Sequence, residues 1–286
     1  MEEEKIMKRK RILFVSILLG LIIVNYPYIS QLINGISESR VVKKYDEELE
    51  QVDTERITAM LEQAHAYNDR IAQNQGGLGD AFTTGGTDEQ YEKLLNLQND
   101  GVMGYIEIPK IDIMLPIYHG VSATVLEKGA GHLYGSSLPV GGDNTHAVIS
   151  SHRGLPSHLL FTDLDQLEYG DIFLITIASE ILAYEVDDIR TVEPYETESL
   201  LVEEGKDYVT LVTCTPYGIN SHRLLVRGER VPYEPEETVT LDIEESHGMQ
   251  YLQRMMLILS MVILMVCGII LLIPRRKDRN GKDGKR

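Results

Sequence analysis

The sequence predicts a mainly β domain, a closed barrel or a sandwich, between two segments apolar enough to cross a membrane. Seven or eight short apolar, β-branched runs lie between residues 101 and 231, with Gly and Pro turns between them and few helical patterns. On either side, residues 12–33 and 255–273 form long uncharged or apolar runs, each sufficient to span a bilayer as a helix.

The charges beside these two runs predict how the chain lies in the plasma membrane. Residues 1–11 contain five Lys and Arg, and residues 274–286 contain seven. Short basic segments stay in the cytoplasm, so both ends are predicted to be cytoplasmic and everything between the spans extracellular. A basic start followed by an apolar run also describes a cleavable signal peptide. Because no clear small-x-small cleavage site follows, an uncleaved anchor is favoured.

The extracellular part is strongly acidic. Outside the two basic ends the chain holds 15 Lys and Arg against 39 Asp and Glu, a formal charge of about −24. This balance argues against a nucleic-acid partner. No Asp-x-Asp-x-Asp-Gly calcium loop is present. We therefore interpret the acidity as a solvated surface and predict neither a metal site nor a cofactor.

Three segments surround the β domain, which we place at residues 101–232. Apolar residues at spacings of three and four predict one or two amphipathic helices over 34–74, which stand off from the membrane and pack against the main domain. Residues 75–100 are Gly-rich at their start and are predicted to form a loop and linker. Asp80 and Phe82 are the side chains in its Gly-rich part that could bind another group. An acidic segment, 233–254, leads to the second span. Short helices are expected near residues 125–128 and 159–167.

One cysteine stands at the end of a strand in this domain. The run Thr-Leu-Val-Thr-Cys ends at Cys214, a Pro/Gly/Asn turn follows, and Arg223 heads the next apolar run. A nearby guanidinium favours the thiolate form of a cysteine and can stabilise an oxyanion. Cys267 lies in the second apolar run, so Cys214 has no intrachain disulfide partner outside the membrane. The alternative is a buried cysteine with a purely structural role.

His152 is the histidine best placed to work with that thiol. It follows the apolar strand 147–151 and precedes the loop signal Arg-Gly-Leu-Pro, where a strand-end imidazole suits acid–base chemistry. His222 is expected to point away from the face of Arg223. The other histidines are expected to be solvated or to lie near turns without an evident partner: His65, His119, His132, His146, His158 and His247.

Together these motifs resemble the sortases, the cell-surface cysteine transpeptidases of Gram-positive bacteria. The resemblance covers about residues 101–231 and rests on Thr-Leu-x-Thr-Cys, an Arg nine positions later and a His 62 positions earlier. It implies an eight-stranded barrel, catalytic roles for Cys214, His152 and Arg223, and a supporting role for Thr213.

Further details resemble class C, the pilin-polymerising branch. They are Thr-Cys-Thr-Pro-Tyr-Gly around Cys214, Leu-Phe-Thr-Asp-Leu after His152 and the C-terminal span. That branch carries a lid with an Asp-Pro-aromatic motif. Here Asp80-Ala81-Phe82 stands in its place without the proline that would stiffen it. By similarity, Asp80 pairs with Arg223 and Phe82 covers Cys214.

The resemblance implies cleavage of an LPXTG-like sorting signal between Thr and Gly, with transfer of the acyl group to a pilin lysine. The partners would be pilins or surface proteins that carry such a signal, together with the plasma membrane. Two alternatives stay open: a housekeeping sortase that joins proteins to cell-wall precursor, and an inactive membrane-anchored scaffold whose Cys214 is merely buried.

Overall fold

The structure is a computed structural model that describes residues 2–74, 78–83, 87–233, 255 and 258–265. It divides into two units, one formed by residues 1–29 with 248–286 and the other by residues 30–247. The predicted acidic segment (apart from Tyr233) and basic tail, and most of the second apolar run, lie outside the described residues.

The first unit contains the beginning of a long helix. Helix α1 runs from Glu2 to Leu49 without interruption. Among the described residues it is the one helix long and apolar enough to cross a membrane. Its apolar side chains Leu13, Leu19 and Ile23 are exposed, as expected of a surface that faces lipid. Of the second apolar run, the structure describes residues 258–265 as helix, and Ser260 Oγ donates to Asn25 Oδ1 at 3.2 Å.

The second unit begins with two helices that pack on the barrel. The last part of α1 belongs to it, so the predicted anchor and the first amphipathic helix are one continuous helix. Tyr45 shows how this helix is fixed, since its hydroxyl donates to the Met103 carbonyl and accepts from the Ala178 amide, each at 3.0 Å. Helix α2, Thr54–Gln73, is capped by Asp53 and buries Ala64 and Tyr67.

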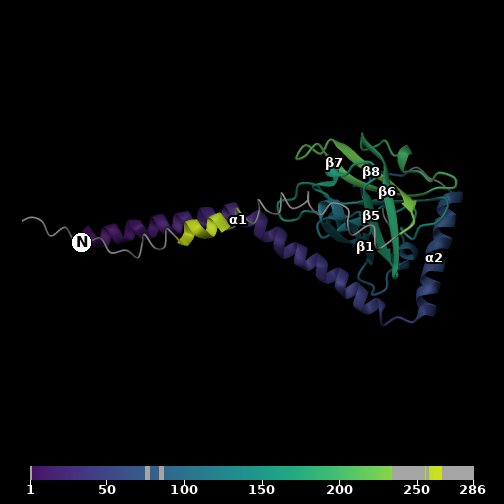
Figure 1. The fold of residues 1–286 in the computed structure, drawn as a ribbon, viewed down its shortest axis with the longest axis horizontal. Helices are drawn as coiled ribbons and strands as arrows, with labels where there is room; N and C mark the ends of the chain where they lie inside the picture. Colours follow the sequence, from purple (N-terminus) through teal and green to yellow (C-terminus); the bar gives the residue numbers. More distant parts are fainter. Residues whose placement is uncertain (1, 75–77, 84–86, 234–254, 256–257, 266–286) are drawn as a thin grey trace, which may run out of the picture. The chain divides into compact units, whose positions relative to one another are not determined.

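The β domain is a closed eight-stranded barrel, which confirms the barrel and excludes the sandwich (Figure 1). Its strands follow one another around the barrel in the order β1-β2-β3-β4-β7-β8-β6-β5. The pairs β2–β3 and β4–β7 are parallel and the others antiparallel. The strands are β1 Val102–Ile108, β2 Ile113–His119, β3 Ala130–His132, β4 Thr145–Ser150, β5 Ile172–Ile177, β6 Glu180–Val192, β7 Asp207–Thr215 and β8 His222–Val231.

Short helices connect the strands near the expected positions. Helix α4 spans Ala123–Leu126, and a 3-10 turn, η2, spans Leu164–Gln166. Two further 3-10 turns are η1, Pro109–Ile111, and η3, Glu198–Leu200. Helix α3, Glu89–Lys93, was not predicted. Asp88 accepts a hydrogen bond from the Tyr91 amide at its start, and Tyr91 is fully buried.

The strands that carry the candidate site have two apolar faces. Inside the barrel, Ile149 of β4, Leu211 of β7 and Val226 of β8 belong to the main core. The residues next to them, Val148, Val212 and Leu225, form a second buried cluster on the opposite face. Because successive side chains of a strand point to opposite faces, this second cluster lies on the outer side of the barrel wall. We call it the outer groove.

Candidate active site

Strand pairing brings the three predicted catalytic residues to one level of the barrel. In the antiparallel pair β7–β8, Cys214 lies directly opposite Arg223. In the parallel pair β4–β7, Ser150 lies opposite Val212, and the Ser151 amide donates to the Val212 carbonyl at 3.1 Å. His152 follows Ser150 by two residues, as Cys214 follows Val212. The two residues thus stand at equivalent positions beyond the last β4–β7 register pair, and the pairing brings them to one level.

The two-residue period of a strand also places these side chains on one face. His152, Cys214 and Arg223 share the parity of the outer-groove residues Val148, Val212 and Leu225. The ring of Phe82 confirms this for two of them, since its centroid lies 5.9 Å from that of His152 and 5.1 Å from the Arg223 guanidinium carbon. The thiol, the imidazole and the guanidinium thus surround one end of the outer groove.

The segment around Asp80 covers this site, and the expected ion pair is present. Arg223 donates from Nε to Asp80 Oδ1 at 2.8 Å and from Nη2 to Asp80 Oδ2 at 2.7 Å. The two side chains are only 12% and 17% exposed. A parallel two-bond contact of this kind is the strongest form that an arginine–carboxylate pair takes.

Residues 78–83 pack against the outer groove although the motif lacks the proline. Ala81 is 3% exposed and packs in the outer groove, with Leu78 and Phe82 against the same cluster. The lid makes its own turn, in which the Thr83 amide donates to the Asp80 carbonyl at 2.9 Å. Thr197, on the connection between β6 and β7, donates to the Leu78 carbonyl at 2.9 Å. We therefore define the lid by its described residues 78–83.

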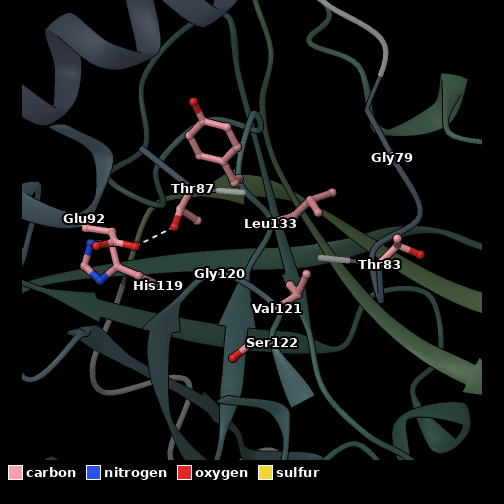
Figure 2. Close-up of a pocket in the computed structure, with 10 residues that line it drawn as sticks. Gly79, Thr83, Thr87, Glu92, His119, Gly120, Val121, Ser122 and Leu133 are labelled. Atoms are coloured by element: carbon pink, nitrogen blue, oxygen red, sulfur yellow. Dashed lines mark hydrogen bonds between the residues drawn. The ribbon is translucent and has the colours of Figure 1, made fainter. Parts of the chain in front are cut away.

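A cleft of about 350 Å³ runs along one edge of the lid (Figure 2). Figure 2 shows Gly79 and Thr83 of the lid on one side and Glu92 with His119 on the other, while Thr87 donates to the Glu92 carboxylate. Val121 and Leu133 contribute both to this cleft and to the outer groove. Among the described residues, this cleft separates the edge of the lid from Glu92 and His119.

With the lid closed, the environment disfavours charge on both the thiol and the imidazole. Burial raises the pKa of Cys214, Arg223 lowers it, and Asp80 raises it. Burial lowers the pKa of His152, and Glu127 raises it. Asp80 thus engages the arginine that would otherwise stabilise a thiolate at Cys214.

Replacing Asp80 by asparagine is expected to activate the thiol. Asp80→Asn removes the ion pair that holds the lid and one cause of the raised pKa of Cys214. We expect faster alkylation by a bulky methanethiosulfonate at neutral pH and a reactivity midpoint at lower pH. The measurement is the alkylation rate as a function of pH. Asp143→Asn, at an exposed aspartate, is the matched control. Equal pH profiles of alkylation in the wild type, Asp80→Asn and Asp143→Asn would contradict the role assigned to Asp80.

Thr213 contributes a buried contact between the two catalytic strands. Its side chain is fully buried and its Oγ1 donates to the Ser151 carbonyl at 2.8 Å. Ser151 precedes His152 and Thr213 precedes Cys214, so the bond joins the two strand ends immediately before the paired residues. The predicted supporting residue therefore lies on β7 and ties it to the residue that follows β4.

Four histidines for which the sequence indicates no partner have one in the structure, which corrects the expectation: His119, His132, His146 and His158. His132 is fully buried between the Tyr91 hydroxyl at 2.8 Å and the Ser137 carbonyl at 2.7 Å. His146 contacts Leu201 O and Thr210 Oγ1, at 2.8 and 2.7 Å. Burial lowers the pKa of each to about 4. His119 contacts the carbonyls of Gly101 and Leu94. Nδ1 of His158 contacts Ser157 Oγ at 2.9 Å.

Sequence reasoning missed the floor of the outer groove and the lid residue Leu78. The signal for the floor was present, because alternate residues of the apolar runs at β4 and β7 must point away from the core. Within the described part of the chain, no group of three or more His, Cys, Asp or Glu is arranged to hold a metal ion.

Comparison with known proteins gives one consistent family. A family model described as "Sortase domain" matches residues 106–231. Sortase A of Streptococcus agalactiae is 36% identical over 131 residues, which cover 43% of this chain and 53% of the relative. Sortase D of Bacillus subtilis is 33% identical over 131 residues, and the match covers 45% of this chain and 63% of the relative. The chain thus spans between half and two thirds of these curated relatives.

Solved structures match over a larger share of their length. Sortase C of Streptococcus pneumoniae is 46% identical with a TM-score of 0.62, and the match covers 68% of this chain and 97% of that one. Sortase C1 of Streptococcus agalactiae is also 46% identical with a TM-score of 0.63, and the match covers 68% and 100%.

Proposed function

Because this chain belongs to the sortase family, we propose that it is a membrane-anchored cysteine transpeptidase of the class C type that polymerises pilins. It cleaves an LPXTG-like sorting signal between Thr and Gly and joins the new acyl end to a pilin lysine. The observation that carries the proposal is the alignment of Cys214, His152 and Arg223 beside one groove.

The first half of the reaction forms a thioester on Cys214. Its thiolate attacks the threonine carbonyl carbon of the sorting signal, and the carbon–nitrogen bond to glycine breaks. His152, as imidazolium, gives its proton to the departing amine. The lid leaves the outer groove beforehand, since Ala81 and Phe82 pack where the signal would lie. Its departure also frees Arg223 from Asp80.

The second half transfers the acyl group to an amine. The Nζ of a pilin lysine attacks the thioester carbonyl, gives a proton to His152, and the carbon–sulfur bond breaks to restore the Cys214 thiolate. An isopeptide bond results. Arg223 donates to the substrate carbonyl oxygen, which becomes negative in both tetrahedral intermediates.

Arg223→Lys is expected to lose most of the activity. A lysine places a single ammonium where a planar fork has several donors in fixed directions, and loss of one oxyanion donor typically costs about 10²–10³-fold in kcat. The measurement is the rate of thioester formation with a sorting-signal peptide. Arg40→Lys, on the exposed part of α1, serves as the control. A wild-type rate in Arg223→Lys would remove the residue from the mechanism.

The function is tested by supplying both substrates to the full chain in membranes or detergent. With a pilin that carries an LPXTG-like signal and a second pilin as amine donor, we expect a Thr–Lys isopeptide link, identified by mass spectrometry of the cross-linked peptides. A product with oligoglycine but none with pilin lysine would favour the housekeeping alternative. No thioester and no product with any signal peptide would favour the inactive scaffold.

The location of the enzyme is part of the proposal. The apolar start of α1 fits a membrane anchor, and the five Lys and Arg that precede it favour a cytoplasmic N-terminus with the barrel outside. A cysteine-reactive reagent that does not cross membranes should label Cys214 in intact cells once the lid is opened by Asp80→Asn.

A further inference from the structure

Arg153, the residue after His152, joins the two catalytic strand ends. Its side chain is 10% exposed. Nη1 donates to Thr215 Oγ1 at 3.2 Å and Nε donates to the Thr162 carbonyl at 3.1 Å. Nη2 pairs with the Asp165 carboxylate. One side chain therefore links the loop after His152 to the residue after Cys214.

The backbone alone does not link these strand ends at that level. The last register pair between β4 and β7 is Ser150 with Val212, and the last amide bond runs from Ser151 to Val212. The loop that follows His152 closes on itself, since the Phe161 amide donates to the His152 carbonyl at 3.1 Å. The spacing between the imidazole and the thiol thus depends on side-chain contacts.

Two such contacts enclose the catalytic pair. Before it, Thr213 Oγ1 bonds to the Ser151 carbonyl, and after it, Arg153 bonds to Thr215 Oγ1. His152 lies between Ser151 and Arg153, and Cys214 lies between Thr213 and Thr215. Each strand end is therefore tied to the other on both sides of its catalytic residue.

We propose that Arg153 and Thr215 form a positioning pair that sets the distance between His152 and Cys214 during acyl transfer. The inference rests on the proposed function and deepens it. Arg153 does not touch the substrate and acts through the two residues that do. The guanidinium is engaged by Thr215, Thr162 and Asp165, so the role proposed for Arg153 is to hold the two strand ends together.

Loss of the positioning pair is expected to lower the rate of thioester formation and to leave the pKa of the Cys214 thiol unchanged. Displacing reacting groups by about 1 Å can cost about 10²-fold, so we expect Arg153→Gln and Thr215→Val to slow thioester formation by about 10- to 100-fold. Thr215→Ser keeps the hydroxyl and should restore most of the rate. The pH midpoint for alkylation of Cys214 by a small reagent should not move in any of these variants.

A double-mutant cycle makes the test specific. If the two side chains act through one contact, Arg153→Gln combined with Thr215→Val should be no slower than the slower single variant. The inference would be overturned if the double variant lost rate by the product of the two single losses. A shifted pH midpoint for alkylation of Cys214, or a wild-type rate of thioester formation in Arg153→Gln, would also overturn it. Failure of the wild-type protein to form any thioester would overturn the proposed function instead.

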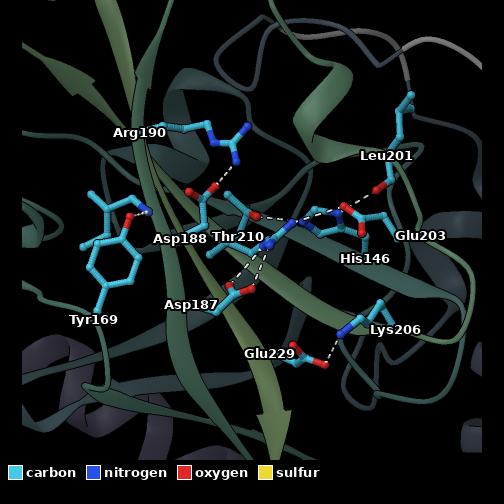
Figure 3. Close-up of polar contacts among 12 residues, drawn as sticks. His146, Tyr169, Asp187, Asp188, Arg190, Leu201, Glu203, Lys206, Thr210 and Glu229 are labelled. Carbon is cyan, nitrogen blue, oxygen red and sulfur yellow. Dashed lines mark hydrogen bonds and ion pairs between the residues drawn. The ribbon is translucent and has the colours of Figure 1, made fainter.

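A matched arginine four residues farther along β8 from Arg223 separates positioning from general stability. The side chain of Arg227 is 17% exposed and donates two hydrogen bonds to Asp187, at 3.0 and 2.7 Å. Figure 3 shows Asp187 among neighbouring polar residues such as His146 and Thr210. Arg227→Gln should lower the melting temperature while it leaves the rate of thioester formation within about twofold at a temperature well below melting. An equal loss of rate in Arg227→Gln and Arg153→Gln would show a purely structural effect.

Discussion

Cys214→Ala is expected to abolish thioester formation and all transfer to lysine. The reason is chemical, because alanine has no atom that can attack a carbonyl, and no other described cysteine is available to replace the thiol. The expected change is complete loss of product within detection, larger than for any other single substitution. It is measured by following isopeptide product and peptide hydrolysis together.

The second cysteine of the sequence provides the matched control. Cys267→Ala removes the other thiol of the chain and should leave both rates unchanged. Retention of transfer or hydrolysis in Cys214→Ala would show that another residue is the nucleophile. Loss of both activities in Cys267→Ala would show that the substitution acts through the membrane segment.

His152→Ala is expected to slow both halves of the reaction by about 10²–10⁴-fold, the usual contribution of a positioned acid–base group. Without the imidazole, the glycine amine leaves unprotonated and the lysine amine attacks without a base. The measurement is single-turnover thioester formation and, separately, aminolysis of the preformed thioester. Burial lowers the pKa of His152, so the fraction of imidazolium rises as the pH falls toward that lowered pKa.

His65→Ala, at an exposed position on α2, is the control and should behave as wild type. Added imidazole should partly restore the rate of His152→Ala if the loss concerns proton transfer. An effect on aminolysis alone, with thioester formation unchanged, would remove His152 from the first half of the mechanism.

The sequence contains most of the site, because the site is built on strands. Apolar alternation and the Pro/Gly/Asn turn predict that Cys214 and Arg223 lie on neighbouring strands, and the structure pairs them directly. The position of His152 beside them required the parallel pairing of β4 with β7, whose strands are far apart in sequence. Local patterns cannot establish such a pairing; here the family resemblance indicated it.

Contacts between segments far apart in the sequence could not be predicted from local sequence patterns. Tyr91 and His132 are 41 residues apart, and only the folded chain shows that they form a hydrogen bond with each other. Arg153 stood out in the sequence only as part of a loop signal, since its partner Thr215 is 62 residues away. The partner of the lid could be predicted only from the family resemblance, because a Gly-rich segment indicates a loop but not where that loop packs.

In the proposed reaction the Cys214 sulfur, once the lid is displaced, accepts the acyl group of a sorting signal. The most direct measurement is the intact mass of the full chain mixed with an LPXTG-like peptide, in the wild type and in Asp80→Asn, followed by peptide mapping. We expect the mass of the chain to increase by that of the peptide cut after threonine. The adduct should map to Cys214, be released by hydroxylamine and be more abundant in Asp80→Asn. An adduct on another residue, or none in Asp80→Asn although its thiol reacts freely, would contradict the proposed reaction.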